Sequence, residues 1–294
     1  SSTAFAMPSM AQMYSSEINL GSVRDTGNVF VRQAQLGNPD LKPATSENHN
    51  FGLIYKTKNF ELSADYWTID YKNRVEIEDA QAMLNQDPNG SSITRTESGD
   101  LIGVTTQYFN EDRTELKGLD LSATSIFNFE DLGELSINLE ATHLIEFMTP
   151  ELQNQSQGSS MINRVGKFNY DSPTHALPRN RINLFVNWHV DGYEHVFNTR
   201  YVDSYQTLRS INSLAQSLGY ENKIDSFLVF DWCLKSETQG GERVFGGNME
   251  IGFCIINLAD EKPPRLYDAP DFSFDTRVHD PRGRIFQISF NYRI

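Results

Sequence analysis

The sequence predicts an all-β protein, a portion of an antiparallel transmembrane β-barrel with about nine spanning strands and long extracellular loops. Three observations predict this fold class. Apolar and polar residues alternate along most of the chain, in runs close to the roughly ten residues that a tilted strand needs to cross a bilayer. The connections between these runs alternate between short turns and long polar segments. The chain contains no apolar run of about 18 residues, which a membrane-spanning helix would need.

The last stretch of the chain, residues 283–294, shows the alternation most clearly. Successive side chains of a strand point to opposite faces, so every second residue lies on the same face. We therefore expect one face of this strand to meet lipid and the other to be polar. The residues of the apolar face are Phe286, Ile288, Phe290, Tyr292 and Ile294.

The composition is compatible with a barrel and argues against two other classes of protein. Hydrophobic residues make up 38% of the 294 residues, and the mean hydropathy of -0.48 is too polar for a helical membrane protein. In a barrel only every second strand residue faces lipid, so the average stays close to that of a soluble protein. The net charge of -14 argues against nucleic acid as a partner, because phosphate backbones bind clustered Lys and Arg.

The first part of the chain predicts one hairpin after a long loop. Residues 1–5 resemble the end of a strand, and residues 8–14 predict a short helix with Pro8 in its first turn. From there to about Asn48 the chain is rich in Asn, Gly, Ser and Pro, which predicts a loop. Residues 49–56 and 60–68 then alternate on either side of a short turn, which predicts a hairpin.

A second hairpin is predicted around the turn at residues 129–133, with strands at residues 119–123 and 135–141. The segment before it, after Arg74, is polar. Within that segment we expect one helical turn at residues 80–85 and a further short strand at residues 101–110. We expect this short strand to belong to an extracellular loop and not to span the membrane.

Two more hairpins and a last loop complete the expected order of elements. One polar segment, residues 149–179, precedes the third hairpin, and another, which ends at residue 223, precedes the fourth. The last loop, residues 260–282, precedes the terminal strand. With nine spanning strands and short turns on the periplasmic side, the C-terminus lies in the periplasm. Because the set is odd and begins within a strand, we expect a C-terminal fragment of a longer barrel. The two hairpins pair residues 182–188 with 197–201 around Asp191-Gly192, and residues 228–234 with 249–255 around Gly240-Gly241.

The two cysteines predict neither a metal site nor a disulfide framework. Cys233 and Cys254 both fall on the polar face of their predicted strands. When the pairing is counted from a turn at Gly240-Gly241, the two cysteines lie several residues out of register. We therefore predict free thiols.

Several short motifs resemble those of the TonB-dependent outer-membrane receptors. Residues 36–43, Leu-Gly-Asn-Pro-Asp-Leu-Lys-Pro, are similar to a family segment that enters a strand in the latter half of the barrel. The chain departs from the family pattern at Ala6, where Arg is usual, at Ala44, where Glu is usual, and at Ile294, where an aromatic residue is usual. The other motifs that carry the resemblance are residues 2–5 with Pro8-Ser9, residues 115–121, residues 257–264 and Gly283-Arg284.

This resemblance implies that residues 1–294 are the C-terminal part of a 22-stranded barrel, with no plug domain in this chain. It implies an outer-membrane receptor or transporter for the active uptake of a scarce nutrient, which is a siderophore-iron complex, cobalamin, a carbohydrate or a peptide. The implied partners are outer-membrane lipid, the protein's own N-terminal plug domain and, through the plug, TonB. No enzymatic activity is implied. The alternative is a non-transporting outer-membrane barrel, either an adhesin or a surface hydrolase.

Polar residues on the strands are the candidates for contact with the ligand or the plug. The alternative for each is a hydrogen bond to another residue of the barrel wall. We expect no catalytic site, cofactor or metal, because no HExxH or G-x-S-x-G motif occurs. The acids of the last loop, among them Asp260, Asp268, Asp271 and Asp275, lack the fixed ligand spacing of a calcium site. The wall candidates are Asp120, Asn138, Glu140, Arg181, Asn183, Arg200 and Asp231.

Aromatic residues lie near the ends of several predicted strands. An amphipathic ring is favoured at the depth of the lipid headgroups, so these residues predict interfacial girdles. The alternative is the ordinary preference of aromatic residues for strands. Trp67 is an exception, because it falls on the lumenal face. The girdle candidates are Tyr55, Trp188, Trp232 and Tyr292.

Overall fold

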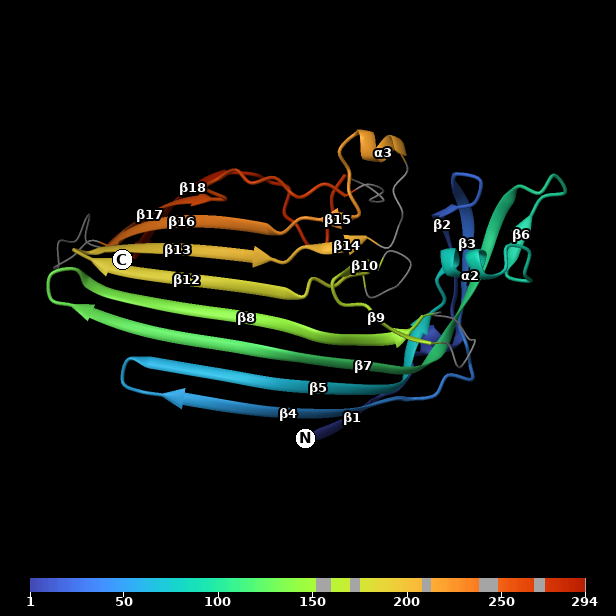
Figure 1. Cartoon of the computed structure of the whole chain (residues 1–294), viewed down its shortest axis with the longest axis horizontal. Coiled ribbons are helices and arrows are strands. Elements are labelled where there is room, and N and C mark those ends of the chain that lie inside the picture. Colours follow the sequence, from blue (N-terminus) through green and yellow to red (C-terminus); the bar gives the residue numbers. More distant parts are fainter. Residues whose placement is uncertain (152–159, 170–174, 208–212, 238–247, 267–272, 294) are drawn as a thin grey trace.

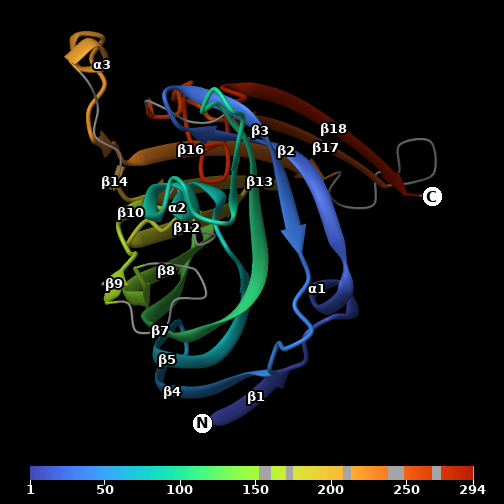
Figure 2. The same cartoon turned by 90° about the vertical axis from the view of Figure 1, so that its right-hand side faces the viewer.

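One curved antiparallel sheet dominates the computed structural model of the chain (Figure 1). The structure describes residues 1–151, 160–169, 175–207, 213–237, 248–266 and 273–293. Seen from the loop end, the sheet curves from β4 through β8 and β12 to β18 (Figure 2). Neighbouring strands on the main path follow the order β1-β4-β5-β7-β8-β12-β13-β16-β17-β18. Their bounds are Ser2–Ala6, Ala44–Lys56, Phe60–Ile77, Leu101–Phe129, Gly133–Pro150, Asn180–Val190, Tyr193–Val202, Phe227–Glu237, Asn248–Ile256 and Ile285–Arg293.

The four predicted hairpins and the terminal strand are confirmed. They appear as β4–β5, β7–β8, β12–β13, β16–β17 and β18, and β1 is the predicted end of a strand. The turn between β12 and β13 has positive φ angles at both central residues, 48° at Asp191 and 80° at Gly192. This is the geometry of the tightest hairpin turns, and Asp-Gly adopts it readily. The turn predicted at Gly240-Gly241 lies outside the described residues.

The prediction of a loop up to about Asn48 is wrong in part, because this segment contains a hairpin that lies off the main path of the sheet. β2 (Ser16–Arg24) pairs with β3 (Asn28–Leu36), and β3 runs parallel to the start of β7. Val23 and Val31 on one face of the hairpin are buried, with exposed fractions of 3% and 1%. The interspersed Asn, Gly and Ser residues concealed this alternation, and the packing that stabilises the hairpin comes from residues far along the chain.

The short strand predicted at residues 101–110 is also corrected, because it is the first part of the 29-residue strand β7. Charged residues interrupt the apolar pattern between this part and the predicted strand at residue 119. Two of them have partners on β5: Glu111 accepts from Arg74 Nε at 2.9 Å, and Arg113 donates to Asp70 at 3.0 Å and 2.7 Å. These cross-strand pairs let the strand continue through a polar stretch.

The helices and short strands gather at the end of the sheet where the long connections lie, on the right of Figure 1. The predicted helices are confirmed as α1 (Met10–Tyr14) and α2 (Ala80–Gln86). α2, β2, β3 and β7 share one small core of Val23, Val31, Ala80, Leu84, Leu101 and Val104. The remaining elements are β6 (Ile93–Arg95), β9 (Met161–Asn163), β10 (Lys167–Asn169), β11 (His175–Ala176), β14 (Tyr205–Thr207), α3 (Ser213–Ser217) and β15 (Lys223–Ile224).

A second small core lies under the later long connections. It consists of Phe168, Ala176, Tyr205, Ile224 and Leu266, with Val278 packed against it. Among the described residues no helix is long and apolar enough to cross a membrane. The two small cores pack the long connections together at one end of the main sheet.

Candidate functional site

All seven wall candidates lie on one face of the main sheet. Glu140 lies opposite Asn183, which lies opposite Arg200 on the next strand. Two residues further along β8 and β12, Thr142 lies opposite Arg181, and Thr142 also lies opposite Asp120 of β7. Asn138 and Asp231 have the same parity in their strands. We call this face of β7, β8, β12, β13, β16 and β17 the polar wall.

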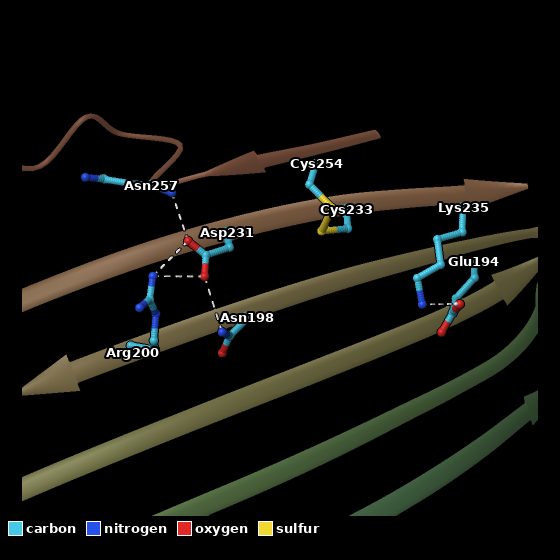
Figure 3. Close-up of a disulfide and its surroundings, with 8 residues drawn as sticks. All are labelled: Glu194, Asn198, Arg200, Asp231, Cys233, Lys235, Cys254 and Asn257. Carbon is cyan, nitrogen blue, oxygen red and sulfur yellow. Dashed lines mark hydrogen bonds and ion pairs between the residues drawn. A yellow bond between two sulfur atoms is a disulfide. The ribbon is translucent and has the colours of Figure 1, made fainter. Parts of the chain in front are cut away.

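Asp231 is the centre of a hydrogen-bond network on the polar wall (Figure 3). Arg200 Nη2 donates to Asp231 Oδ1 at 3.1 Å, and Asn198 Nδ2 donates to Asp231 Oδ2 at 3.3 Å. The backbone N–H of Asn257 donates to Oδ1 at 2.8 Å. The Asp231 side chain is only 13% exposed. A carboxylate this buried needs such partners, so Arg200 and Asp231 stabilise the wall.

Two further candidates are also bonded within the wall. Thr142 donates to Asp120 Oδ1 at 2.8 Å across β7 and β8. Thr124 and Asn138 approach each other at 3.5 Å. For these two residues, as for Arg200 and Asp231, the wall itself supplies a partner.

The remaining three candidates are different. Within the described part of the chain, the side chains of Glu140, Arg181 and Asn183 make no hydrogen bond or ion pair. They come from neighbouring rungs of β8 and β12. These three side chains are the ones that remain available to a partner outside this chain's own wall.

The prediction of free thiols is wrong, because Cys233 and Cys254 form a disulfide between β16 and β17 (Figure 3). The two residues are direct cross-strand partners with a Cα–Cα distance of 4.1 Å. The last rung before the connection is Glu237 opposite Glu250, and each cysteine lies four residues along its strand from that rung. Counting from Gly240-Gly241 would pair Cys233 with Asn248, six residues from its actual partner, so the assumed register was wrong. The shared parity of the two cysteines was the signal in the sequence that pointed to a disulfide.

Sequence reasoning missed a buried cluster where the last loop packs on β14. Tyr205 Oη donates to Asp275 Oδ2 at 2.9 Å and lies 3.1 Å from His279 Nε2. Tyr205 is 2% exposed and His279 3% exposed. Burial lowers the pKa of His279 to about 4 and raises the pKa of Tyr205, so both side chains are neutral at pH 7. The cluster joins Tyr205 to residues 70 and 74 positions further along the chain, and nothing in the local sequence signals it.

The loop acids do not form a metal site in the described part of the chain. Asp275 binds Tyr205, and Asp260 accepts from Lys262 Nζ at 3.0 Å and from the backbone of Arg284 at 2.9 Å. Asp268 and Asp271 lie outside the described residues. Among the described residues, no group of three or more His, Cys, Asp or Glu could hold a metal ion.

Aromatic side chains form a continuous row on the apolar face near the short turns. The ring of His195 lies 5.3 Å from Trp188 and 6.2 Å from Trp232, and Trp232 lies 6.1 Å from Phe253. Trp188 Nε1 also donates to the carbonyl of Leu132 in the β7–β8 turn at 2.8 Å. Two of the girdle candidates, Trp188 and Trp232, belong to this row, and their place at a membrane interface stays a prediction.

Trp67 lies on the opposite face, as predicted. It pairs with Gly118, and a Cβ atom built on Gly118 would lie 2.2 Å from Cζ2 of the Trp67 ring. The ring therefore occupies the space that any other side chain at position 118 would fill. Glycine is required there because the ring approaches the backbone closely.

Comparison with known proteins identifies the family. A family model described as "TonB dependent receptor-like, beta-barrel" matches residues 1–232. The chain belongs to the TonB-dependent receptor family. The motifs at residues 2–9, 36–43 and 115–121 all lie within the matched range, and the resemblance that they predicted is confirmed. No curated protein sequence matches the chain.

Solved structures with the same fold are outer-membrane β-barrels of this family. A variant of the ferric enterobactin receptor PfeA from Pseudomonas aeruginosa has a TM-score of 0.57 and 16% identity, over 98% of this chain and 36% of that one. The siderophore receptor PirA from Acinetobacter baumannii has a TM-score of 0.60 and 15% identity, over 98% and 37%. The outer-membrane transporter YddB from Escherichia coli has a TM-score of 0.50 and 14% identity, over 88% and 33%.

These comparisons confirm that the chain has the fold of an antiparallel outer-membrane β-barrel, and they show how much of such a barrel it covers. The chain spans a little over a third of the length of the two siderophore receptors. It is therefore similar to part of a TonB-dependent barrel. The family and the matched structures are receptors and transporters, in agreement with the predicted class of function.

Proposed function

We propose that the chain is the C-terminal part of a TonB-dependent transporter that takes up a ferric siderophore across the outer membrane. The observation that carries the proposal is the match of residues 1–232 to the receptor barrel. One of the similar structures is a PfeA variant in complex with enterobactin, which favours a siderophore over cobalamin, a carbohydrate or a peptide. In this proposal the N-terminal plug domain and TonB act from outside residues 1–294.

We further propose that the polar wall faces the lumen and the apolar face meets lipid. The apolar face carries exposed residues such as Phe230, Ile288 and Phe290, with exposed fractions of 41%, 77% and 63%. Large apolar side chains are stabilised by lipid at this position, whereas the network of Asp231 and Arg200 would be unfavourable there. The short turns then lie in the periplasm together with the C-terminus, and the long connections lie outside the cell.

Within the lumen, the three unpaired side chains are the proposed contacts with the plug or the ligand. Glu140 and Asn183 face each other on one rung, and Arg181 lies on the next. Asp120, Asn138, Arg200 and Asp231 have partners in the wall, so we assign them to its structure.

The first test uses the intact gene product. We expect it to remain in carbonate-washed outer membranes and to migrate differently on a gel before and after boiling. In cells grown under iron limitation, uptake of radioactive ferric enterobactin should depend on both this gene and TonB. The transport function would be contradicted if the protein behaves as a barrel but takes up none of the nutrient classes named above. It would also be contradicted if that uptake does not depend on TonB.

A second test separates ligand contact from plug contact. Arg181→Ala and Asn183→Ala should weaken ligand binding if these side chains touch the ligand. If they hold the plug instead, the affinity stays the same and the cells admit more of a large hydrophilic antibiotic. Asn138→Ala is the matched control, because Asn138 lies on the same wall but approaches Thr124. If Arg181→Ala and Asn183→Ala, like the control, change neither measurement, both roles are contradicted.

A further inference from the structure

The two sulfur atoms of the disulfide lie on the polar wall. Cys233 lies between Asp231 and Lys235 on the same face of β16 (Figure 3). Lys235 Nζ donates to Glu194 at 3.1 Å on one side of the disulfide, and Arg200 binds Asp231 on the other. The disulfide is therefore surrounded by charged groups of the wall and does not belong to the apolar face.

This position limits how the disulfide can form. Thiol–disulfide exchange requires the attacking sulfur to reach the sulfur of its partner, so access decides the rate. In the proposed function, the polar wall of the closed barrel encloses a lumen that is filled by the plug. A folded protein oxidant is too large to bring its own cysteine to Cys233 or Cys254 there, whereas an unfolded or partly folded chain exposes both.

We propose that Cys233 and Cys254 are the substrate of a periplasmic protein oxidant of the dithiol–disulfide class, which acts before the barrel closes. The inference rests on the proposed function, because that function places the polar wall in the lumen. The thiolate of one cysteine attacks the oxidant's disulfide and displaces one of its thiolates. The thiolate of the other cysteine then attacks the resulting mixed disulfide, which closes the Cys233–Cys254 bond and leaves the oxidant as a dithiol with two electrons and two protons.

The pairing of β16 and β17 explains what early oxidation contributes. The other hairpins turn within residues 57–59, 130–132 and 191–192, whereas residues 238–247 separate the ends of β16 and β17 in the sequence. Short turns of defined type fix the register of a hairpin, and a longer connection fixes it less well. A bond between Cys233 and Cys254 allows only one register, so this hairpin enters the membrane already aligned.

The test compares two oxidants on the full-length protein, purified with reduced thiols. One oxidant is a periplasmic thiol oxidoreductase in its oxidised form, and the other is oxidised glutathione. Each acts on the urea-unfolded protein and on the protein folded in detergent, and remaining thiols are trapped with a maleimide that changes mobility on a gel. We expect the protein oxidant to react roughly 100-fold more slowly with the folded protein. Equal rates on the two forms would overturn the proposal.

A matched control places the same chemistry on an exposed hairpin. In a Cys233→Ala/Cys254→Ala background, Leu20→Cys with Arg32→Cys creates a cross-strand pair on β2 and β3, where both positions are exposed. The protein oxidant should oxidise this pair at similar rates in both forms. If the folded control is also protected, slow oxidation is a general property of the detergent complex and the proposal is rejected.

The failure of this inference is distinguishable from failure of the proposed function. Heat-modifiable mobility reports a closed barrel and nutrient uptake reports transport, and neither measurement depends on when the disulfide forms. A protein that transports its ligand normally but is oxidised equally well after folding would retain the proposed function and lose this inference.

Discussion

Leu139→Arg tests the assignment of the two faces of the sheet. Leu139 lies on the apolar face of β8, between Ala123 of β7 and Leu184 of β12. It is six residues from Gly133, where the strand begins. At about 3.3 Å per residue and a tilt of about 40°, this places it roughly 15 Å above the turn, near the middle of an apolar band about 25 Å tall.

An arginine at that depth should cost about 2 to 4 kcal/mol of folding free energy. The assay is reversible urea unfolding of the full-length protein in lipid vesicles, followed by tryptophan fluorescence. Asn138→Arg is the control, because Asn138 is the adjacent residue of the same strand and points to the polar wall. Equal costs for the two variants would refute the assignment of faces and with it the barrel.

The same reasoning predicts a small effect for Ile251→Arg. Ile251 lies one residue from the Glu237–Glu250 rung that ends the hairpin, so it is near the edge of the apolar band. The cost of arginine falls to about 0 to 1 kcal/mol at the interface. A large cost at Ile251 with a small one at Leu139 would show that the depth calculation is wrong even if the faces are right.

Three further predictions concern single contacts. Gly118→Val should destabilise the barrel by about 1 to 3 kcal/mol in the same unfolding assay, because it overlaps the Trp67 ring, and adding Trp67→Ala should recover part of the loss. Protonation of His279 opposes folding, since its pKa is about 4 in the folded protein and about 6.5 unfolded. Stability should therefore fall as the pH drops from about 6.5 to 4, and His279→Phe should flatten that fall. Reduction of Cys233–Cys254, which are 21 residues apart, should cost about 3 kcal/mol, measured as a shift of the urea midpoint with and without reductant.

Alternation along the sequence predicted most of the main sheet, because each strand has an apolar face. The prediction failed where charged residues interrupt the alternation and the strand is stabilised by pairs with a neighbouring strand instead. The polar stretch of β7 continues as a strand because Arg74 and Asp70 on β5 pair with Glu111 and Arg113. A period-2 pattern contains no information about partners that lie about 40 residues away.

The register between strands was the second quantity that the sequence left open. The faces of Cys233 and Cys254 were predicted correctly, but the disulfide depends on which rung they share, and that depends on the length of the turn. The cluster of Tyr205, Asp275 and His279 depends on the packing of a long connection, for which the sequence has no periodic signal. Faces are therefore predictable from local pattern, whereas contacts across strands and loops are not.

The charges of the unpaired wall residues bear on what binds them. Glu140, Arg181 and Asn183 together present one negative group, one positive group and one amide, so their summed charge is near zero. A ligand with only anionic groups would be attracted by Arg181 and repelled by Glu140 at a similar distance. A polypeptide surface offers donors and acceptors together and can pair with all three. This mixture favours the plug over an anionic ferric siderophore as the partner of these three residues, and it directs the search for ligand contacts to the long connections at the outer end of the sheet.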